Sequence, residues 1–388
     1  MNNRLKLILA GAITFGMISC QQNNKTSQNQ FADSSTITLL DSATFETTQE
    51  GKSVSLFTLE NSKGMKATIT NYGGRILSLL VPLKDGKLVD VVVGMKDLES
   101  IKKSTDPYYG AIIGRYGNRI AKGQFTIDGK TYTSSINDGV NTLHGGKVGY
   151  HYVVWDAKLI NKTTLELSYF SKDLEEGYPG NLTIKVIYKL NEDNELNIEY
   201  KATTDKKTVL NLTNHAYFNL NGEGKGTITN HELEIYANEF TPIDTTLIPT
   251  GKLQPVINTA FDFNKAKKIG ARINDENDQI INGKGYDHNY VLNGKTGLGM
   301  THAASVRGDL TGIVMDVYTQ EPGIQFYSGN FMKGVNIFKN GIKDDFRTAF
   351  CLETQHYPNS PNQPNFPSTL LNPGQEFNSI SIYKFSNR

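Results

Sequence analysis

Alternation of apolar and polar residues with a period of two is the feature that most constrains the fold of this chain. Such alternation places every second side chain on the same face of an extended strand. Five runs follow it and are rich in residues that favour strands: "TLELSYF" (164–170), "LTIKVIYKL" (182–190), "ELNIEYKAT" (195–203), "ELEIYANEF" (232–240) and "GIVMDVYTQ" (312–320). No long stretch shows the period of an amphipathic helix. The sequence therefore predicts an all-β protein.

Turn signals between these runs indicate that neighbouring strands are antiparallel. They are typical of hairpins and stand at Lys84-Asp85-Gly86, Asp128-Gly129, Asn221-Gly222 and Asn293-Gly294. Neither a repeat nor an internal linker interrupts residues 41–388, so we expect a single domain there. Because that length exceeds what one core usually supports, the best prediction is a very large antiparallel β-sandwich.

Composition and charge limit the class of partner. The chain has 388 residues, of which 38% are hydrophobic and 20% are charged, as expected for a folded globular protein. Forty Lys and Arg against 39 Asp and Glu leave a formal net charge of +1. This balance provides no electrostatic footprint for nucleic acid, so we expect no nucleic-acid partner.

The N-terminus has the pattern of an export signal. Arg4 and Lys6 precede an apolar run over residues 7–18 that is too short to span a bilayer. The following Met17-Ile18-Ser19-Cys20 resembles the lipobox of bacterial lipoproteins. We expect residues 1–20 to be a lipoprotein signal peptide, Cys20 to be lipidated, and the polar residues 21–40 to form a flexible tether. The alternative is an ordinary cleaved signal with an incidental cysteine.

This N-terminus predicts an exported lipoprotein on the periplasmic face of a bacterial membrane, held there only by its lipid anchor. If Cys20 is acylated, Cys351 has no intrachain partner, because the chain contains two cysteines. The fold must then be stabilised by its core and not by a disulfide.

Two glycine-containing stretches carry groups suited to ligand binding. "GRYGNRIAKG" (114–123) contains Asn118 and Arg119, although composition alone favours a surface ion pair for Arg119. "NTLHGG" (141–146) places His144 before two glycines, which let a backbone approach a ligand closely. Each stretch alone is weak evidence.

Three further stretches place ionisable groups in strand-like surroundings. In "LNLTNHAYFNL" (210–220), an extended chain would put His215 on a hydrogen-bonding face opposite a nearly all-apolar one. "YDHNY" (286–290) contributes Asp287. "FCLETQHYP" (350–358) embeds Glu353 in an otherwise apolar or aromatic strand, where a carboxylate is costly to bury unless it is paired.

Together with "PGIQFYSGN" (322–330), these stretches resemble the aldose 1-epimerase, or galactose mutarotase, family, in the family's order and over residues from about 50 to the C-terminus. One departure is Gly117, where relatives often carry alanine. The resemblance implies a mutarotase-like supersandwich and an isomerase that interconverts the α and β anomers of free aldohexoses such as glucose and galactose. It implies Glu353 as base and His215 as the acid for the ring oxygen. The sugar-binding residues that it implies are Asn118, Arg119, His144, Asp287 and Gln325.

Mutarotation requires a base for the anomeric hydroxyl and an acid for the ring oxygen, each contributing roughly 10²–10⁴-fold. By this route, ring opening needs Glu353 ionised and His215 protonated at once. No cofactor has a task in it, and we expect a monomer that binds a free monosaccharide. A metal site of His144, His215 and Glu353 is disfavoured because the sequence lacks close ligand spacing. The oxygen-rich residues 274–283 are either a structural calcium site or a solvated loop.

Three other functions remain open from the sequence. An epimerase of a phosphorylated hexose would add basic groups for the phosphate, and no dedicated cluster accompanies the motifs. A non-catalytic carbohydrate-binding protein would not need both His215 and Glu353. A glycoside hydrolase needs two carboxylates, a role that Asp287 and Glu353 could imitate.

Overall fold

The computed structural model describes residues 1, 37, 39–294 and 299–387. Ile37–Arg388 form one compact unit. Cys20, the predicted signal peptide after Met1 and most of the predicted tether lie outside the described residues.

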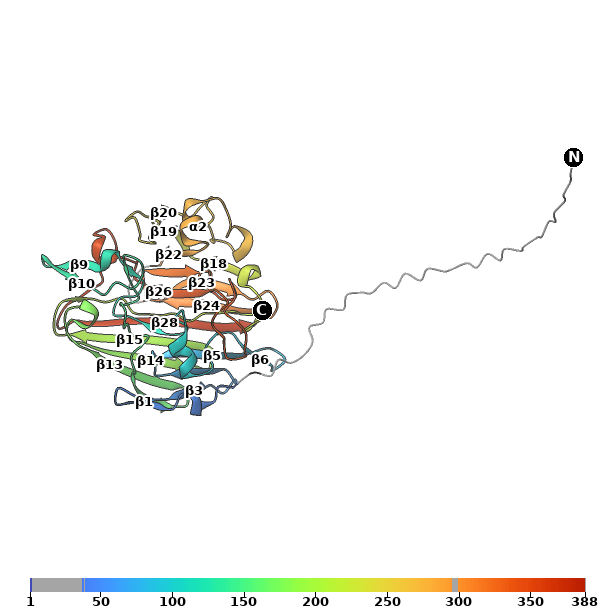
Figure 1. Cartoon of the computed structure of the whole chain (residues 1–388), viewed down its shortest axis with the longest axis horizontal. Helices are drawn as coiled ribbons and strands as arrows, with labels where there is room; N and C mark the ends of the chain where they lie inside the picture. The colour runs from blue at the N-terminus through green and yellow to red at the C-terminus, as the bar shows by residue number, and fades with distance from the viewer. Residues whose placement is uncertain (2–36, 38, 295–298, 388) are drawn as a thin grey trace. The chain divides into compact units, whose positions relative to one another are not determined.

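The largest element is a nine-stranded antiparallel sheet (Figure 1). Its strands, in spatial order, are β12 Asp156–Asn161, β13 Thr164–Ser171, β14 Leu182–Leu190, β15 Glu195–Thr204, β28 Glu376–Asn387, β24 Ile313–Thr319, β23 Thr301–Arg307, β18 Glu232–Ile235 and β21 Lys267–Lys268. The C-terminal strand β28 lies in the middle of the sheet, between β15 and β24, and so joins its two halves.

Two smaller antiparallel sheets complete the layers. The five-stranded sheet has the order β20 Gln254–Pro255, β19 Ala237–Phe240, β22 Asp287–Leu292, β25 Gly323–Tyr327 and β26 Cys351–Gln355. The four-stranded sheet comprises β3 Leu56–Glu60, β4 Lys66–Thr70, β5 Arg75–Pro82 and β6 Leu88–Asp90.

The remaining elements are short. The two-stranded pairs are β1 Thr47–Gln49 with β2 Lys52–Val54, β9 Gln124–Ile127 with β10 Lys130–Thr133, β8 Arg119–Ile120 with β11 Thr142–Leu143, β7 Ile112–Ile113 with β17 Thr213–Asn214, and β16 Thr208–Val209 with β27 Leu370–Leu371. The helices are α1 Leu98–Lys103, α2 Asp278–Gly283 and the 3₁₀ turns η1 Ser42–Thr44, η2 Ala121–Gly123, η3 Glu175–Gly177, η4 Ile228–Asn230, η5 Ile269–Ala271 and η6 Ser360–Asn362. None of these described helices has the length and apolar character needed to cross a membrane.

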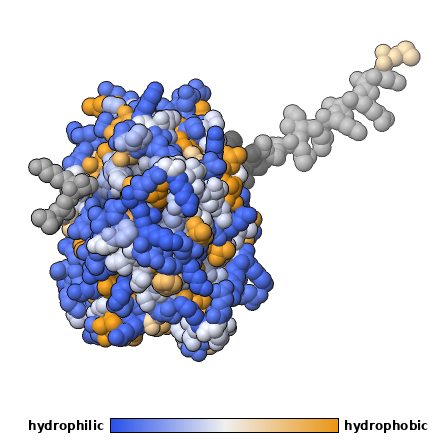
Figure 2. All heavy atoms as spheres, turned by 90° about the vertical axis from the view of Figure 1, so that its left-hand side faces the viewer, coloured by the Kyte–Doolittle hydropathy of each residue, from blue (hydrophilic) through white to orange (hydrophobic). Residues whose placement is uncertain are grey.

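One hydrophobic core joins the three sheets. β14 alternates buried and more exposed residues along its length, as the period-two pattern predicts. The buried side chains of the large sheet, such as Ile184 and Met315, belong to the same core cluster as Phe326 of the five-stranded sheet and Ile69 of the four-stranded sheet. The predicted all-β antiparallel sandwich is therefore confirmed. Figure 2 shows one face of the molecule, on which polar residues predominate and apolar residues form small separate groups.

Three local predictions need correction. Two predicted hairpin turns, Asn221-Gly222 and Asn293-Gly294, do not join paired strands, because the chain passes from one sheet or segment to another there. The turns at 84–86 and 128–129 do connect paired strands. Residues 274–283 are not simply a loop, since 278–283 form α2, with the side chain of Asn277 as its N-cap. The side-chain oxygen of Asn274 accepts a hydrogen bond from Arg347.

The segment 210–220 is not one regular strand. Only Thr213–Asn214 pairs in a ladder, with β7, and the flanking backbone bonds to several other segments: Leu210 donates to Thr369, and Phe218 exchanges bonds with Phe350. All eleven residues are buried. Both faces are covered, so the polar face that the sequence predicts is enclosed by other segments.

Candidate active site

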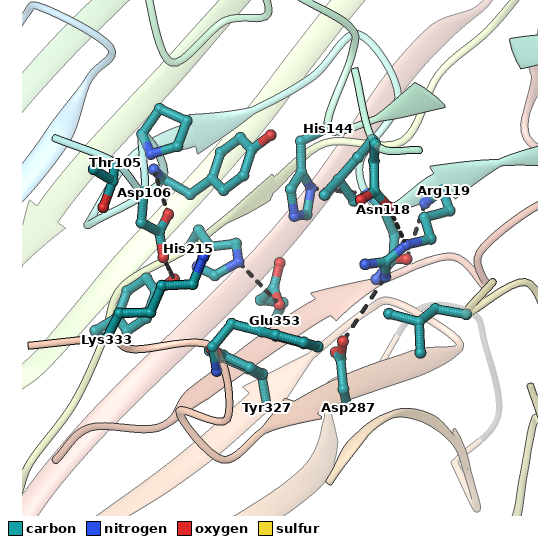
Figure 3. Close-up of a pocket in the computed structure, with 17 residues that line it drawn as sticks. Thr105, Asp106, Asn118, Arg119, His144, His215, Asp287, Tyr327, Lys333 and Glu353 are labelled. Carbon is teal, nitrogen blue, oxygen red and sulfur yellow. Dashed lines mark hydrogen bonds and ion pairs between the residues drawn. The ribbon is translucent and has the colours of Figure 1, made fainter. Parts of the chain in front are cut away.

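A cavity of about 260 Å³ opens above the five-stranded sheet (Figure 3). Its volume is near the lower end for ligand pockets, roughly 300–1,000 Å³, as suits a small ligand. Six of the seven predicted sugar-site residues line it: Asn118, Arg119, His144, His215, Asp287 and Glu353.

The floor of the cavity is the polar face of the five-stranded sheet. Strand pairing places Gln325 opposite Glu353, and Asp287 opposite Tyr327. Residues opposite each other in an antiparallel pair share a face, so these side chains point to one side while apolar neighbours such as Phe326 enter the core. The sheet thereby fixes a row of polar groups on a rigid support.

Gln325 does not itself line the cavity. It is buried, and its side-chain nitrogen donates a 2.7 Å hydrogen bond to Oδ1 of Asp287. The structure thus places Gln325 behind Asp287, as a support for that carboxylate, and not in the lining where the sequence placed it.

His215 follows directly after β17 and is held by its backbone. Its N–H donates to the carbonyl of Ala111 at 2.9 Å, and its carbonyl accepts from the N–H of Gly110 at 2.9 Å. The polar neighbours Asn211 and Asn219 bond to backbone carbonyls and not to the histidine ring.

His215 and Glu353 face each other across the cavity floor, with Nε2 3.6 Å from Oε1. The other carboxylate oxygen, Oε2, has no hydrogen-bond partner among the described residues. The Nδ1 of His215 lies 3.4 Å from Sγ of Cys351. Oε2 is thus buried and unpaired, while Oε1 faces the imidazole of His215.

Burial shifts the two groups in opposite directions. Loss of solvation raises the pKa of Glu353 well above its usual 4.5, and the charge of Asp287 adds to that effect while Arg119 opposes it. Loss of solvation lowers the pKa of His215 to about 3. Burial therefore favours a proton on Glu353 and a neutral His215, the reverse of the arrangement expected from the sequence for ring opening.

The opposite wall comes from the two glycine-containing stretches, which pair through β8 and β11. The backbone N–H of Asn118 donates to Nδ1 of His144 at 3.1 Å, so the neutral ring carries its proton on Nε2. Burial and the neighbouring His215 lower the pKa of His144 well below 6.5. His144 therefore serves as a neutral Nε2–H donor. Gly145, at φ +90°, allows the close backbone approach here, because a Cβ would overlap the carbonyl of Gly114.

Arg119 links two carboxylates at one end of the cavity. Its Nε donates to Asp138 at 2.8 Å, and its Nη1 lies 3.8 Å from Oδ2 of Asp287. Burial raises the pKa of Asp287, while the charge of Arg119 and the hydrogen bond from Gln325 oppose this shift. This end therefore offers both charged donors and charged acceptors for hydroxyl groups.

The fold also brings potential ligand atoms of His144, His215 and Glu353 within 4.8 Å of one another, a proximity that sequence spacing did not indicate. The donor set fits a metal poorly. Nδ1 of His144 accepts a backbone N–H, so the ring proton is on Nε2 and that nitrogen has no lone pair for a metal. A histidine that binds a metal normally uses one ring nitrogen for the metal and donates the proton of the other nitrogen to an acceptor. This hydrogen bond therefore disfavours a metal ion at the cluster.

Sequence reasoning missed four residues that complete the cavity or its support. Asp106, Tyr108, Tyr217 and Tyr327 line the cavity, and the rings of Tyr108 and Tyr217 stack on His215 with centroids 5.7 and 5.0 Å apart. The available signal was "DPYYG" (106–110), a turn with two aromatic residues beside a carboxylate.

Comparison with known proteins gives one consistent result. The family model described as aldose 1-epimerase matches residues 55–384. The chain is 43% identical to galactose mutarotase of Sus scrofa over 333 residues, which cover 86% of this chain and 94% of the relative. It is 39% identical to aldose 1-epimerase of Escherichia coli over 338 residues, which cover 87% of this chain and 96% of the relative.

Solved structures agree with the sequence comparisons. A GalM/aldose epimerase homologue from C. elegans superposes with a TM-score of 0.78 at 30% identity, over 86% of this chain and 99% of that one. Galactose 1-epimerase from Lactobacillus acidophilus gives a TM-score of 0.75 at 29% identity, over 88% and 96%. With this match over most of its length, the chain belongs to the aldose 1-epimerase family.

Proposed function

We propose that the protein is an isomerase that interconverts the α and β anomers of free aldohexoses such as glucose and galactose. The observation that carries the proposal is the facing of His215 and Glu353 at 3.6 Å on the floor of a cavity lined by hydroxyl-binding groups. The family's curated members named galactose mutarotase and aldose 1-epimerase support the same reaction.

In the proposed reaction, the carboxylate of Glu353 accepts the proton of the anomeric hydroxyl while Nε2 of His215 donates a proton to the ring oxygen. The C1–O5 bond breaks, the C1–C2 bond rotates, and the two transfers run in reverse to close the ring on the other face. His144 donates its Nε2–H toward the same region, and Arg119 and Asp287 hold sugar hydroxyls. No electron moves and nothing leaves, so no cofactor has a task in these steps.

The shifted pKa values bear on this cycle. Ring opening transfers a proton onto Glu353 and removes one from His215, which is the distribution that burial already favours in the free protein. The reactive arrangement, with ionised Glu353 and protonated His215, contains the same total number of protons. The ratio of the two forms is therefore independent of pH, and the site favours the proton distribution that follows ring opening.

Charge in the cavity disfavours a phosphorylated substrate. Four carboxyl groups line it, from Asp106, Asp138, Asp287 and Glu353. The lining cations are Arg119, which is engaged by two of these carboxylates, and Lys333. A phosphate would meet a net negative environment, so a neutral sugar is the better fit.

The test uses polarimetry of freshly dissolved α-glucose and α-galactose. Glu353→Gln and His215→Asn should each lower kcat roughly 10²-fold or more while sugar binding is largely retained. Because the two residues act in one coupled event, the double variant should lose little more than the worse single variant. Near wild-type mutarotation by either single variant would refute the assignment, and hydrolysis of an oligosaccharide by the wild type would point to a glycosidase.

We also infer that the protein is an exported lipoprotein. The support is the apolar run that ends at Cys20 and the polar segment after it. We expect mass spectrometry of membrane-extracted protein to find cleavage before Cys20 and a lipid on its thiol. An unmodified Cys20 in that sample would overturn the inference without affecting the proposed reaction.

A further inference from the structure

Asp106 is a carboxylate in the cavity that the proposed reaction does not use. It lies in the turn between α1 and β7 and lines the same cavity as His215 and Glu353. Its Oδ1 accepts the backbone N–H of Tyr108 at 3.1 Å, and its Oδ2 accepts the hydroxyl of Tyr217 at 2.5 Å. These two donors fix the position of the carboxylate.

The same two tyrosines fix Asp106 relative to the acid of the reaction. The ring of Tyr108 stacks on His215 at a centroid distance of 5.7 Å, and the ring of Tyr217 stacks on it at 5.0 Å. Asp106 is thus held by the residues that flank the imidazole. A group bound by Asp106 would be positioned directly with respect to His215.

Asp106 has spare acceptor capacity. Among the described residues, no Lys, Arg or His nitrogen lies within ion-pair distance of it, although Lys333 lines the cavity as well. Arg75, whose charge acts on Asp106 from a distance, instead donates to the carbonyls of Tyr109 and His151. Since each ionised carboxylate oxygen accepts about two hydrogen bonds, one donor on each oxygen leaves room for a further donor.

Asp106 lies opposite the residues proposed above to bind sugar hydroxyls. In Figure 3, Asp106 lies on one side of His215 and Glu353, whereas Arg119 and Asp287 lie on the other. A pyranose carries hydroxyl groups around its ring, so a sugar placed over the acid and base reaches both ends of the cavity. A carboxylate accepts hydrogen bonds only, so the group of a neutral sugar that Asp106 can bind is a hydroxyl.

We propose that Asp106 is a second hydroxyl-binding carboxylate, which holds the sugar at the end of the cavity opposite Asp287 and so sets the ring over His215 and Glu353. This inference rests on the proposed mutarotase function and extends it to a residue that determines which hydroxyl pattern is accepted.

The experiment compares the full chain with its Asp106→Asn variant on glucose and on 2-, 3-, 4- and 6-deoxyglucose, by polarimetry. Asparagine keeps an oxygen for Tyr217 but removes the charge. On glucose, kcat/KM should fall roughly 10- to 100-fold, as for loss of a hydrogen bond to a charged group. On the one deoxy sugar that lacks the bound hydroxyl, wild type and variant should agree within about twofold.

Asp287→Asn is the matched control, since its penalty should vanish on a different deoxy sugar. Tyr217→Phe, which keeps the ring on His215 but releases Asp106, should show a smaller penalty with the same sugar dependence as Asp106→Asn. An equal penalty on every sugar, no penalty on glucose, or one deoxy sugar that cancels both carboxylate variants would each overturn the proposal. Failure of the wild type to mutarotate glucose would instead refute the proposed function.

Discussion

The low pKa of His215 makes a quantitative prediction about activity in acid. Activity requires that the His215–Glu353 pair hold one proton, because a second proton leaves no base. With a pKa of about 3, His215 carries the second proton in about 1% of molecules at pH 5, whereas an ordinary histidine with a pKa of 6.5 would carry it in about 97%. We therefore expect nearly equal kcat at pH 5 and pH 7, where an unperturbed histidine would give a decrease of about 25-fold.

The alkaline limb has the opposite origin. Since burial raises the pKa of Glu353, the pair keeps its single proton until the pH rises through that raised value, and activity should then fall. Both limbs belong to the coupled pair and not to either residue alone.

The assay is the initial rate of glucose mutarotation between pH 4 and pH 10, with the buffer-catalysed rate subtracted and the fold checked by circular dichroism at each pH. Asp287→Asn provides the control. If its carboxyl group binds hydroxyls and transfers no proton, as proposed, the variant should be slower while the acidic limb stays in place. A wild-type acidic limb near pH 6.5 would refute the reasoning about burial, and an acidic limb that moves in Asp287→Asn would mean that Asp287 itself titrates.

The fold supplies two further predictions. Gly145→Ala should lower both kcat and Tm, because φ is +90° there and the added Cβ would overlap the carbonyl of Gly114. Gly129→Ala is the control, since φ is +78° but no atom lies within 4 Å of the added Cβ. This control should lose only about 1–3 kcal/mol of stability to backbone strain and should keep full kcat. His356 and Glu321 form a buried pair 2.6 Å apart, and the charge of Glu321 raises the pKa of His356 against the effect of burial. The stabilisation that protonated His356 gives the fold is therefore complete below pH 6.5 and is lost as the pH rises through the raised pKa. Calorimetry should therefore show a decline in Tm above that point that is absent in His356→Gln, and an unchanged pH dependence in this variant would contradict the assignment.

Local patterns in the sequence were sufficient to predict the class of fold, and the family resemblance of its motifs supplied the proposed acid and base. Alternation over residues 164–203 corresponds to β13, β14 and β15, paired in sequence order. This was predictable because side-chain direction along a strand depends only on local backbone geometry, with its period of two. Glu353 was likewise conspicuous, since a carboxylate among apolar strand residues signals burial.

The completion of the site depends on contacts between segments that are distant in the chain. Asp106 reaches His215 through Tyr217, although 109 positions separate the two residues in the chain, and the pairing of β22 with β25 places Gln325 behind Asp287. The residues 210–220 have both faces covered because several distant segments bond to them, which alternation along one segment does not reveal. The opposite pKa shifts of His215 and Glu353 also depend on distant residues, because solvation and charge are set by everything that packs around a group and not by its neighbours in sequence.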